Sequence, residues 1–335
     1  MSVAKELNRA RSQRAPMTGD RPWHGQCSLQ LISKTATDDL QSRLTVHQSQ
    51  CTAPFKIQRA NLDHDGRCQL PLLHTAGGLV GGDQLSVNVK AGADSRGLVT
   101  SVAAQKVYGS VGRSKQHPKG RWASQECHFE LETNADLEWL PQELVVFQGG
   151  LYKQRMQVEL QPKASFLCAE VVRLGRTAAG ETLNEGAWRS SLEICRQTPI
   201  GRQWELVDQL ELNSEVLQSL HGMGTQPVFG SFVWAAPHPL TADVMEILLR
   251  NCRTDRANLE GSMACGGLDQ GLVARYIGPS SQAARQWFSR LWARTRQLRR
   301  LSTPQPPREW PLQEEGTFSN ERFTKNHQSP SASPH

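Results

Sequence analysis

The stretch HTAGGLVGGDQLSVNV, residues 74–89, decides which kind of fold to expect, because glycine-rich loops serve both nucleotide enzymes and sheet proteins. A phosphate-binding loop leads into a helix, whose free amide groups and dipole meet the anion. Here the glycines end at Asp83 and are followed by QLSVNV, which alternates apolar and polar residues as a strand does. The stretch also lacks the Gly-Lys-Ser/Thr of a P-loop. We therefore predict a tight corner between strands, in which glycines adopt positive φ angles and let backbones approach closely.

Alternation with a period of two continues through most of the chain and predicts half-buried sheet. It is clearest in ECHFELE (126–132), QRMQVEL (154–160), WRSSLEI (188–194) and QWELVDQLEL (203–212). In the last of these, Trp204, Leu206, Leu210 and Leu212 should share one face. Similar runs occupy 28–32, 43–47, 84–89, 98–102, 144–147, 165–172, 227–235 and 271–277. Because few helical patterns intervene, we expect a mainly β fold.

Two segments in the C-terminal half have helical patterns instead. LTADVMEILLRNC (240–252) contains Thr241 as a plausible N-cap. Segment 282–301 carries its apolar residues on one stripe, together with six arginines and no acid. We expect the stripe to pack on the sheet and the arginines to be displayed on the rest of the helix. Since this one element accounts for the net charge of +6, a nucleic-acid-binding surface is not indicated.

The composition of the two ends differs from that of the middle. Residues 1–22 form a basic arm without the apolar stretch of a signal peptide, and 311–335 form a Pro/Ser-rich tail; both are expected to be disordered. A single β-rich domain over 23–310 remains. Eight cysteines without a CxxC pair predict buried thiols in a cytoplasmic protein. No apolar run is long enough to predict a membrane span.

Several blocks, taken in order, resemble the urease accessory protein UreD family, called UreH in some species. These are APFKIQR (53–59), HTAGGLVGGDQL (74–85), TSVAAQKVY (100–108), LEWLPQE (137–143), LGRTAAGE (174–181), GLVARYIG (271–278), WFSRLWARTR (287–296) and PREW (307–310). Each block is a weak motif, but their common order is specific. The resemblance covers about residues 23–310.

The resemblance implies a β-helix-like body of stacked sheets with a pair of helices. It also implies a non-enzymatic assembly factor that acts with UreF and the GTPase UreG, binds apo-urease and helps to insert nickel into its active site. GTP hydrolysis would belong to the partner, and a homodimer could form through the accessory complex. No permanently bound cofactor is expected, only transient passage of nickel.

A protein that hands nickel on must not trap it, so we expect sparse oxygen ligands along a wet passage rather than a Cys/His cage. The candidates for such a path, or for a partner-facing polar surface, are His74, Asp83, Glu138, Glu143 and Glu181. Other roles are open from the residues alone. Asp83 could cap the loop amides, Glu138 and Glu143 could be solvated charges at strand ends, and Glu181 could pair with Arg173 or Arg176.

Two other functions are compatible with this composition. A β-rich carbohydrate-active hydrolase could use a carboxylate pair, with tryptophans as sugar platforms. The tryptophans at 139, 188, 204, 234, 287 and 292 fall on apolar faces, however, where core packing is the better interpretation. A nucleic-acid-binding module could use the arginine-rich helix, but packing of that helix on a sheet explains the same pattern.

Overall fold

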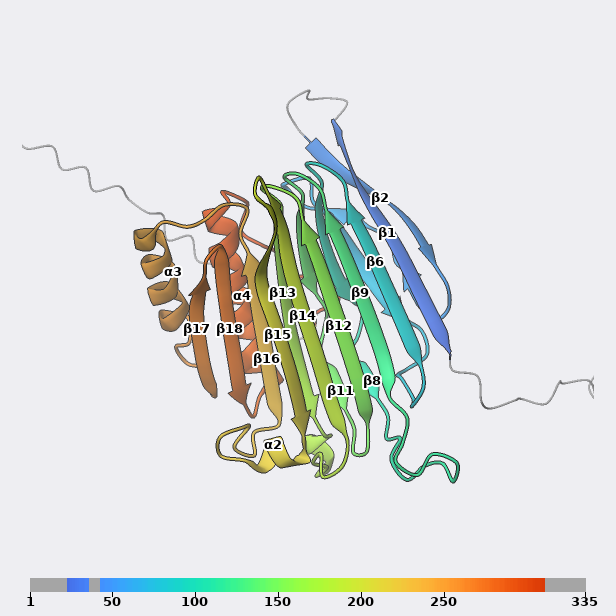
Figure 1. Cartoon of the computed structure of the whole chain (residues 1–335). Coiled ribbons are helices and arrows are strands. Elements are labelled where there is room, and N and C mark those ends of the chain that lie inside the picture. The colour runs from blue at the N-terminus through green and yellow to red at the C-terminus, as the bar shows by residue number, and fades with distance from the viewer. Residues whose placement is uncertain (1–22, 36–42, 311–335) are drawn as a thin grey trace, which may run out of the picture.

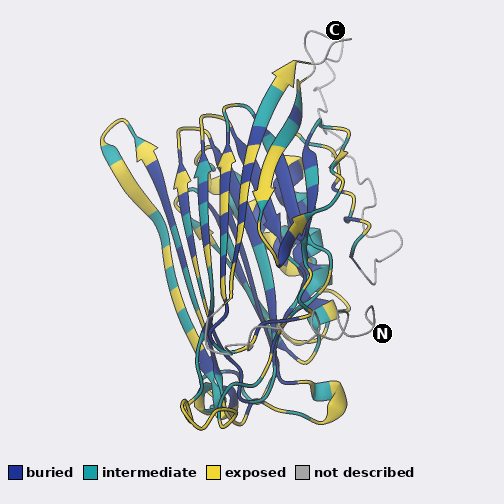
Figure 2. Cartoon of the chain, turned by 90° about the vertical axis from the view of Figure 1, so that its right-hand side faces the viewer, coloured by how far each residue is buried: buried dark blue, intermediate teal, exposed yellow. Residues whose placement is uncertain are grey.

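In a computed structural model, which describes residues 23–35 and 43–310, the chain forms two stacked β-sheets (Figure 1). Two helices lie beside one of the sheets, and buried residues run through the space between the layers (Figure 2). The mainly β prediction is confirmed. The predictions made for residues 1–22 and 311–335 lie outside the described residues.

The first sheet has seven strands. In spatial order these are β15 (Gly201–Asn213), β14 (Ala187–Thr198), β12 (Leu151–Leu160), β9 (Ala123–Leu131), β6 (Gln84–Ala91), β1 (His24–Thr35) and β2 (Arg43–Cys51). Only the pairs at its two edges, β1 with β2 and β14 with β15, are antiparallel. The inner strands pair in parallel.

The second sheet has eleven strands. Its main path is β17 (Ser262–Leu268), β18 (Gly271–Gly278), β16 (Val228–Ala235), β13 (Ser165–Leu174), β10 (Asp136–Leu140), β7 (Arg96–Ser101), β5 (Cys68–His74) and β3 (Phe55–Ile57). Three short strands join this path at its sides: β4 (Asn61–Leu62), β8 (Gln105–Val107) and β11 (Leu144–Val146).

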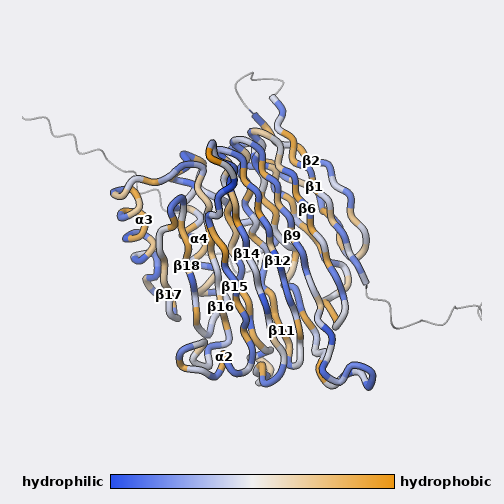
Figure 3. Tube along the Cα trace, viewed as in Figure 1, coloured by the Kyte–Doolittle hydropathy of each residue, from blue (hydrophilic) through white to orange (hydrophobic). Residues whose placement is uncertain are grey.

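From β5 to β14 the chain alternates between the layers, so each pass adds one parallel strand to each sheet. Period two then places one face of every inner strand in the core between the sheets. Hydrophobic and hydrophilic residues alternate along these strands (Figure 3). Phe129 of β9 meets Trp139 of β10 and Phe166 of β13 there. β13 has buried residues on both faces, because helices cover the other side of its sheet.

The two predicted helices are confirmed as α3 (Ala242–Thr254) and α4 (Ser281–Leu298), and Thr241 caps α3 as expected. The other helical elements among the described residues are a short helix, α2 (Ser214–Gln218), and a 3-10 turn, η1 (Thr177–Ala179). Trp287, Leu291 and Trp292 of α4 are buried on the eleven-stranded sheet. Within 23–35 and 43–310, no helix combines the length and apolarity needed to cross a bilayer.

The prediction that α4 displays its arginines is wrong for five of the six, and only Arg300 is exposed. Arg290 and Arg294 bond to Asp255, which follows α3. Arg285, Arg296 and the C-cap residue Arg299 turn toward the sheet, and the Arg296 side chain is only 2% exposed. Each pairs with a carboxylate of a distant segment. Sequence periodicity identified the apolar stripe but gave no sign of these partners.

The prediction that Trp204 lies on the buried face of its strand is also wrong, since its side chain is 57% exposed. The strands pair Ile194 with Leu206 but Cys195 with Trp204, which leaves Glu205 as an extra residue in a β-bulge. The bulge reverses the alternation, so Trp204 points outward while Leu206 packs inward.

Candidate functional site

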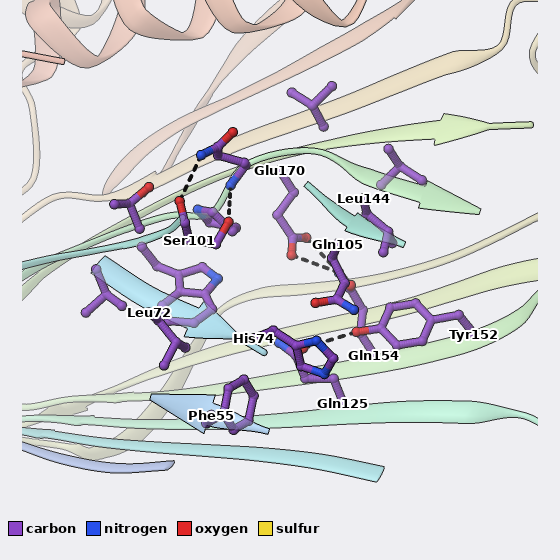
Figure 4. Close-up of a pocket in the computed structure, with 17 residues that line it drawn as sticks. Phe55, Leu72, His74, Ser101, Gln105, Gln125, Leu144, Tyr152, Gln154 and Glu170 are labelled. Atoms are coloured by element: carbon purple, nitrogen blue, oxygen red, sulfur yellow. Dashed lines mark hydrogen bonds between the residues drawn. The ribbon is translucent and has the colours of Figure 1, made fainter. Parts of the chain in front are cut away.

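A cavity of about 80 Å³ lies between the two sheets (Figure 4). Its wall is partly apolar, with Phe55 and Leu72 among its residues. The polar side chains on it come from both layers and include His74 of β5, Gln154 of β12 and Glu170 of β13. A polar pocket inside an otherwise apolar core is costly to build, so it is the natural candidate for a functional site.

Glu170 is the carboxyl group on this wall, and its main partner is neutral. Both of its oxygens accept hydrogen bonds from Gln154 Nε2, at 2.9 and 2.8 Å. The loss of water around it raises its pKa to about 7, although the Gln154 bond and the charge of Arg275 oppose this. Arg275 is itself held by Asp208 at 2.5 Å. Glu170 can therefore bind or release a proton near neutral pH.

His74 ends β5 at the same cavity, with its ring edge-on to Phe55 at 6.0 Å between centroids. Burial lowers the pKa of His74, and the charge of Asp83 opposes this only in part. The imidazole is thus neutral at pH 7. Its Nε2 is buried without a hydrogen-bond partner among the described residues. An unpartnered imidazole nitrogen facing a cavity is suited to meet a metal ion or water.

The glycine corner has the predicted structure, because it leads into strand β6 rather than a helix. Gly77 and Gly82 have φ angles of +67° and +102°. At Gly78 a Cβ would lie 2.9 Å from the Lys106 carbonyl oxygen, so the close approach of the two backbones also requires glycine there. Asp83 is buried and accepts a hydrogen bond from the Val80 amide at 2.9 Å. It caps this loop, as one of its two predicted roles required.

Glu138 is fully buried beneath α4, so the alternative of a solvated strand end is wrong for it. It accepts two hydrogen bonds from Arg296, at 3.0 and 2.7 Å, and one from Arg299 at 2.9 Å. Arg67 lies 3.6 Å away. Burial alone would raise the pKa of Glu138, but the three guanidinium groups outweigh it and hold the pKa well below its ordinary value.

The other two predicted glutamates also pair with arginines. Glu143 accepts a hydrogen bond from Arg285 at 3.0 Å. Glu181 accepts hydrogen bonds from Arg176, at 2.9 and 2.5 Å, and from the Gln148 amide at 2.9 Å, and the Arg176 bonds lower the pKa of Glu181. The predicted ion pair with Glu181 thus forms through Arg176.

The five predicted residues therefore do not form one cluster. His74 lines the cavity with Asp83 nearby, whereas Glu138 and Glu143 anchor α4 and Glu181 holds a separate turn. Over the described ranges, no group of three or more His, Cys, Asp or Glu residues could hold a metal ion. Sequence reasoning missed Glu170, although a glutamate within the apolar run SFLCAEVV was a usable signal.

Comparison with known proteins gives this geometry a context. The family model described as UreD urease accessory protein matches residues 24–311. The chain belongs to the UreD family.

Relatives in the UreD family span nearly the same length. A urease accessory protein UreD of Prochlorococcus marinus (strain MIT 9313) is 99% identical over 319 residues, covering 95% of this chain and all of that protein. One of Parasynechococcus marenigrum (strain WH8102) is 57% identical over 314 residues, covering 94% and 98%. One of Prochlorococcus marinus (strain NATL2A) is 52% identical over 293 residues, covering 87% and 95%.

Proposed function

We propose that this chain is a non-enzymatic scaffold of urease maturation that works in the cytoplasm with UreF and the GTPase UreG on apo-urease. Membership of the UreD family supports a role in urease maturation. All eight cysteines are free thiols, which suits a reducing compartment. The proposal assigns GTP hydrolysis to UreG, and to this chain the binding of partners and the handling of nickel.

The cavity between the sheets carries the nickel part of this proposal. It combines a neutral imidazole at His74 with a carboxyl at Glu170 that titrates near pH 7. Both groups can contact Ni²⁺ in exchange for water or a proton. Two such ligands with amide groups around them bind more weakly than a closed cage of four. Weak, exchangeable binding is what passage of a cargo ion needs.

The remaining predicted residues fit supporting roles in the same proposal. Asp83 holds the glycine corner beside His74 through its bond to the Val80 amide, and its negative charge partly offsets the lowering of the His74 pKa by burial. Glu138 and Glu143 attach α4 to the eleven-stranded sheet. Glu181, with the half-exposed Arg176, is the predicted residue best placed to face a partner.

The carbohydrate hydrolase is not favoured. Five of the six tryptophans considered as sugar platforms are buried; these are Trp139, Trp188, Trp234, Trp287 and Trp292. The carboxylates of Asp83 and Glu138 are occupied by donors of the protein itself.

The test is reconstitution of apo-urease activation with UreF, UreG, GTP and nickel, with and without this chain. Activation should require the chain, and UreF should be recovered with it in a pull-down. His74→Ala should reduce activation while the complex still forms, whereas His128→Ala, on the outer face of β9, should not. Turnover of a substrate by the chain alone, or full activation without it, would contradict the proposal.

A further inference from the structure

A second and larger cavity, of about 320 Å³, lies where the C-terminal end of α4 meets the turns before β10 and β13. These turns present Asn134 and Lys163, both with positive φ angles, while Arg300 follows the helix. The volume is in the range of pockets that enclose small ligands. Neither the glutamates nor the histidine of the proposed nickel route line it.

The lining of this cavity is strongly basic. Positive charge comes from Arg96, Lys163, Arg299 and Arg300, and among the described residues of the lining the one carboxylate is that of Asp136. That carboxylate is already neutralised, because Arg67 and Arg299 both donate to it at 2.7 Å. Lys163 and Arg300 have no ion-pair partner within the described ranges, so their charge is available to a ligand.

The end of α4 does not cancel this charge. A helix C-terminus carries negative partial charge on its last carbonyls. Here the amides of Arg300 and Leu301 bond back to the Gln297 and Arg296 carbonyls, at 3.0 and 3.0 Å. The Arg299 side chain covers the Thr295 carbonyl at 3.2 Å. The helix end is therefore satisfied internally.

The rest of the cavity wall is apolar. Leu240, Leu298 and Leu301 line it together with Trp234 and Pro237. Leu298 is 39% exposed, so part of this apolar wall is accessible from solvent. We infer that this cavity binds a small amphipathic anion, with its carboxylate or phosphate head at Lys163 and Arg300 and its apolar body on the leucines.

The experiment is calorimetric titration of the full chain with octanoate, which has both parts of such a ligand. Acetate and inorganic phosphate supply the head alone, and 1-octanol supplies the body alone. Octanoate should bind at least about tenfold more tightly than any of these, and its affinity should fall with rising ionic strength. Equal affinities, or no binding of octanoate at millimolar concentration, would overturn the inference.

Variants assign the binding to the cavity. The double variant Lys163→Gln, Arg300→Gln should weaken octanoate binding about tenfold, since it removes the two unpaired charges. The matched control Lys119→Gln, Lys153→Gln removes the same charge from exposed positions outside the cavity and should bind as wild type does. Identical weakening in both double variants would show a general charge effect and reject the site.

Discussion

Glu138 and Glu170 lie on neighbouring parallel strands of one sheet, yet their surroundings shift the pKa values of the two carboxyl groups in opposite directions. Glu138 of β10 points toward α4 and meets three arginines, which hold its pKa below the ordinary value. Glu170 of β13 points into the space between the sheets and meets a glutamine amide, so burial raises its pKa to about 7. The first carboxylate is charged at neutral pH and holds the fold together, whereas the second can exchange a proton near neutral pH.

The comparison shows that burial alone does not mark a functional carboxylate. What distinguishes the two glutamates is whether the protein supplies a compensating charge. A buried ion pair immobilises its members, and a buried carboxyl with neutral neighbours keeps its ability to bind a proton or cation.

Removal of Glu138 should have the largest effect on stability. Glu138→Ala leaves Arg296 buried with reduced compensation, which typically costs about 3–5 kcal/mol of unfolding free energy. Urea titration monitored by circular dichroism measures this. Glu130→Ala, an exposed pair with Lys90, should cost at most about 1 kcal/mol. Similar losses of unfolding free energy in both variants would contradict the distinction between the buried ion pair and the exposed one.

Glu170 should give a pH dependence that Glu138 does not. Its folded pKa of about 7 lies above the ordinary value of 4.5, so between these pH values only the folded chain keeps the proton. Stability therefore falls as pH rises through this window, by about 3 kcal/mol in all. Glu170→Gln should remove that fall and be the more stable form above pH 7. Unfolding curves measured from pH 5 to 8 that coincide in slope for the two proteins would refute this.

The same linkage between pKa and stability predicts a pH dependence of the opposite sign for Glu138. Because its folded pKa is depressed, its stabilising effect is fully present above its ordinary pKa of 4.5 and is lost as pH falls below that value. Glu138→Gln, although less stable at pH 7, should show a shallower loss below pH 4.5. An acid titration of unfolding free energy for both proteins compares the two slopes.

Asp83 provides a smaller, local comparison. Asp83→Ala removes the acceptor of the Val80 amide and should destabilise the chain by about 1 kcal/mol. Asp83→Asn keeps an acceptor oxygen and should recover most of this loss. Thermal unfolding of the three proteins would show the order, and an Asn variant no better than Ala would argue against the capping role.

The pair of Arg176 and Glu181 should give the smallest effect. Arg176 is 52% exposed, so solvent screens the pair, and a double-mutant cycle with alanine at both positions should find little or no coupling. A coupling as large as the loss expected at Glu138 would mean that exposure does not separate the two kinds of pair.

The sheet content, both helices and the glycine corner could be predicted from sequence because their signals are local. Period two, the Thr241 cap and the strand after Asp83 are each readable within about ten residues. The pairing of Glu138 with Arg296 spans 158 positions and leaves no local trace. The bulge opposite Cys195 could not be predicted for a different reason. One extra residue reverses the alternation of inward and outward side chains beyond it, and nothing in the sequence marks that residue.

The candidate site was only partly predictable for the same reason. His74 was predictable because it adjoins a glycine motif, whereas Glu170 lies in the middle of a strand and belongs to no motif. Its significance depends on Gln154 and on the cavity, and both come from other passes of the chain.

The most direct test of the account is the nickel content of urease matured with Glu170→Gln, measured at equal amounts of folded chain and of assembled complex. Glu126→Gln, on the outer face of β9, is the matched control. We predict that Glu170→Gln folds and assembles normally but yields urease deficient in nickel, while Glu126→Gln yields fully loaded enzyme. Full nickel loading with Glu170→Gln would contradict the assignment of the cavity as the nickel route.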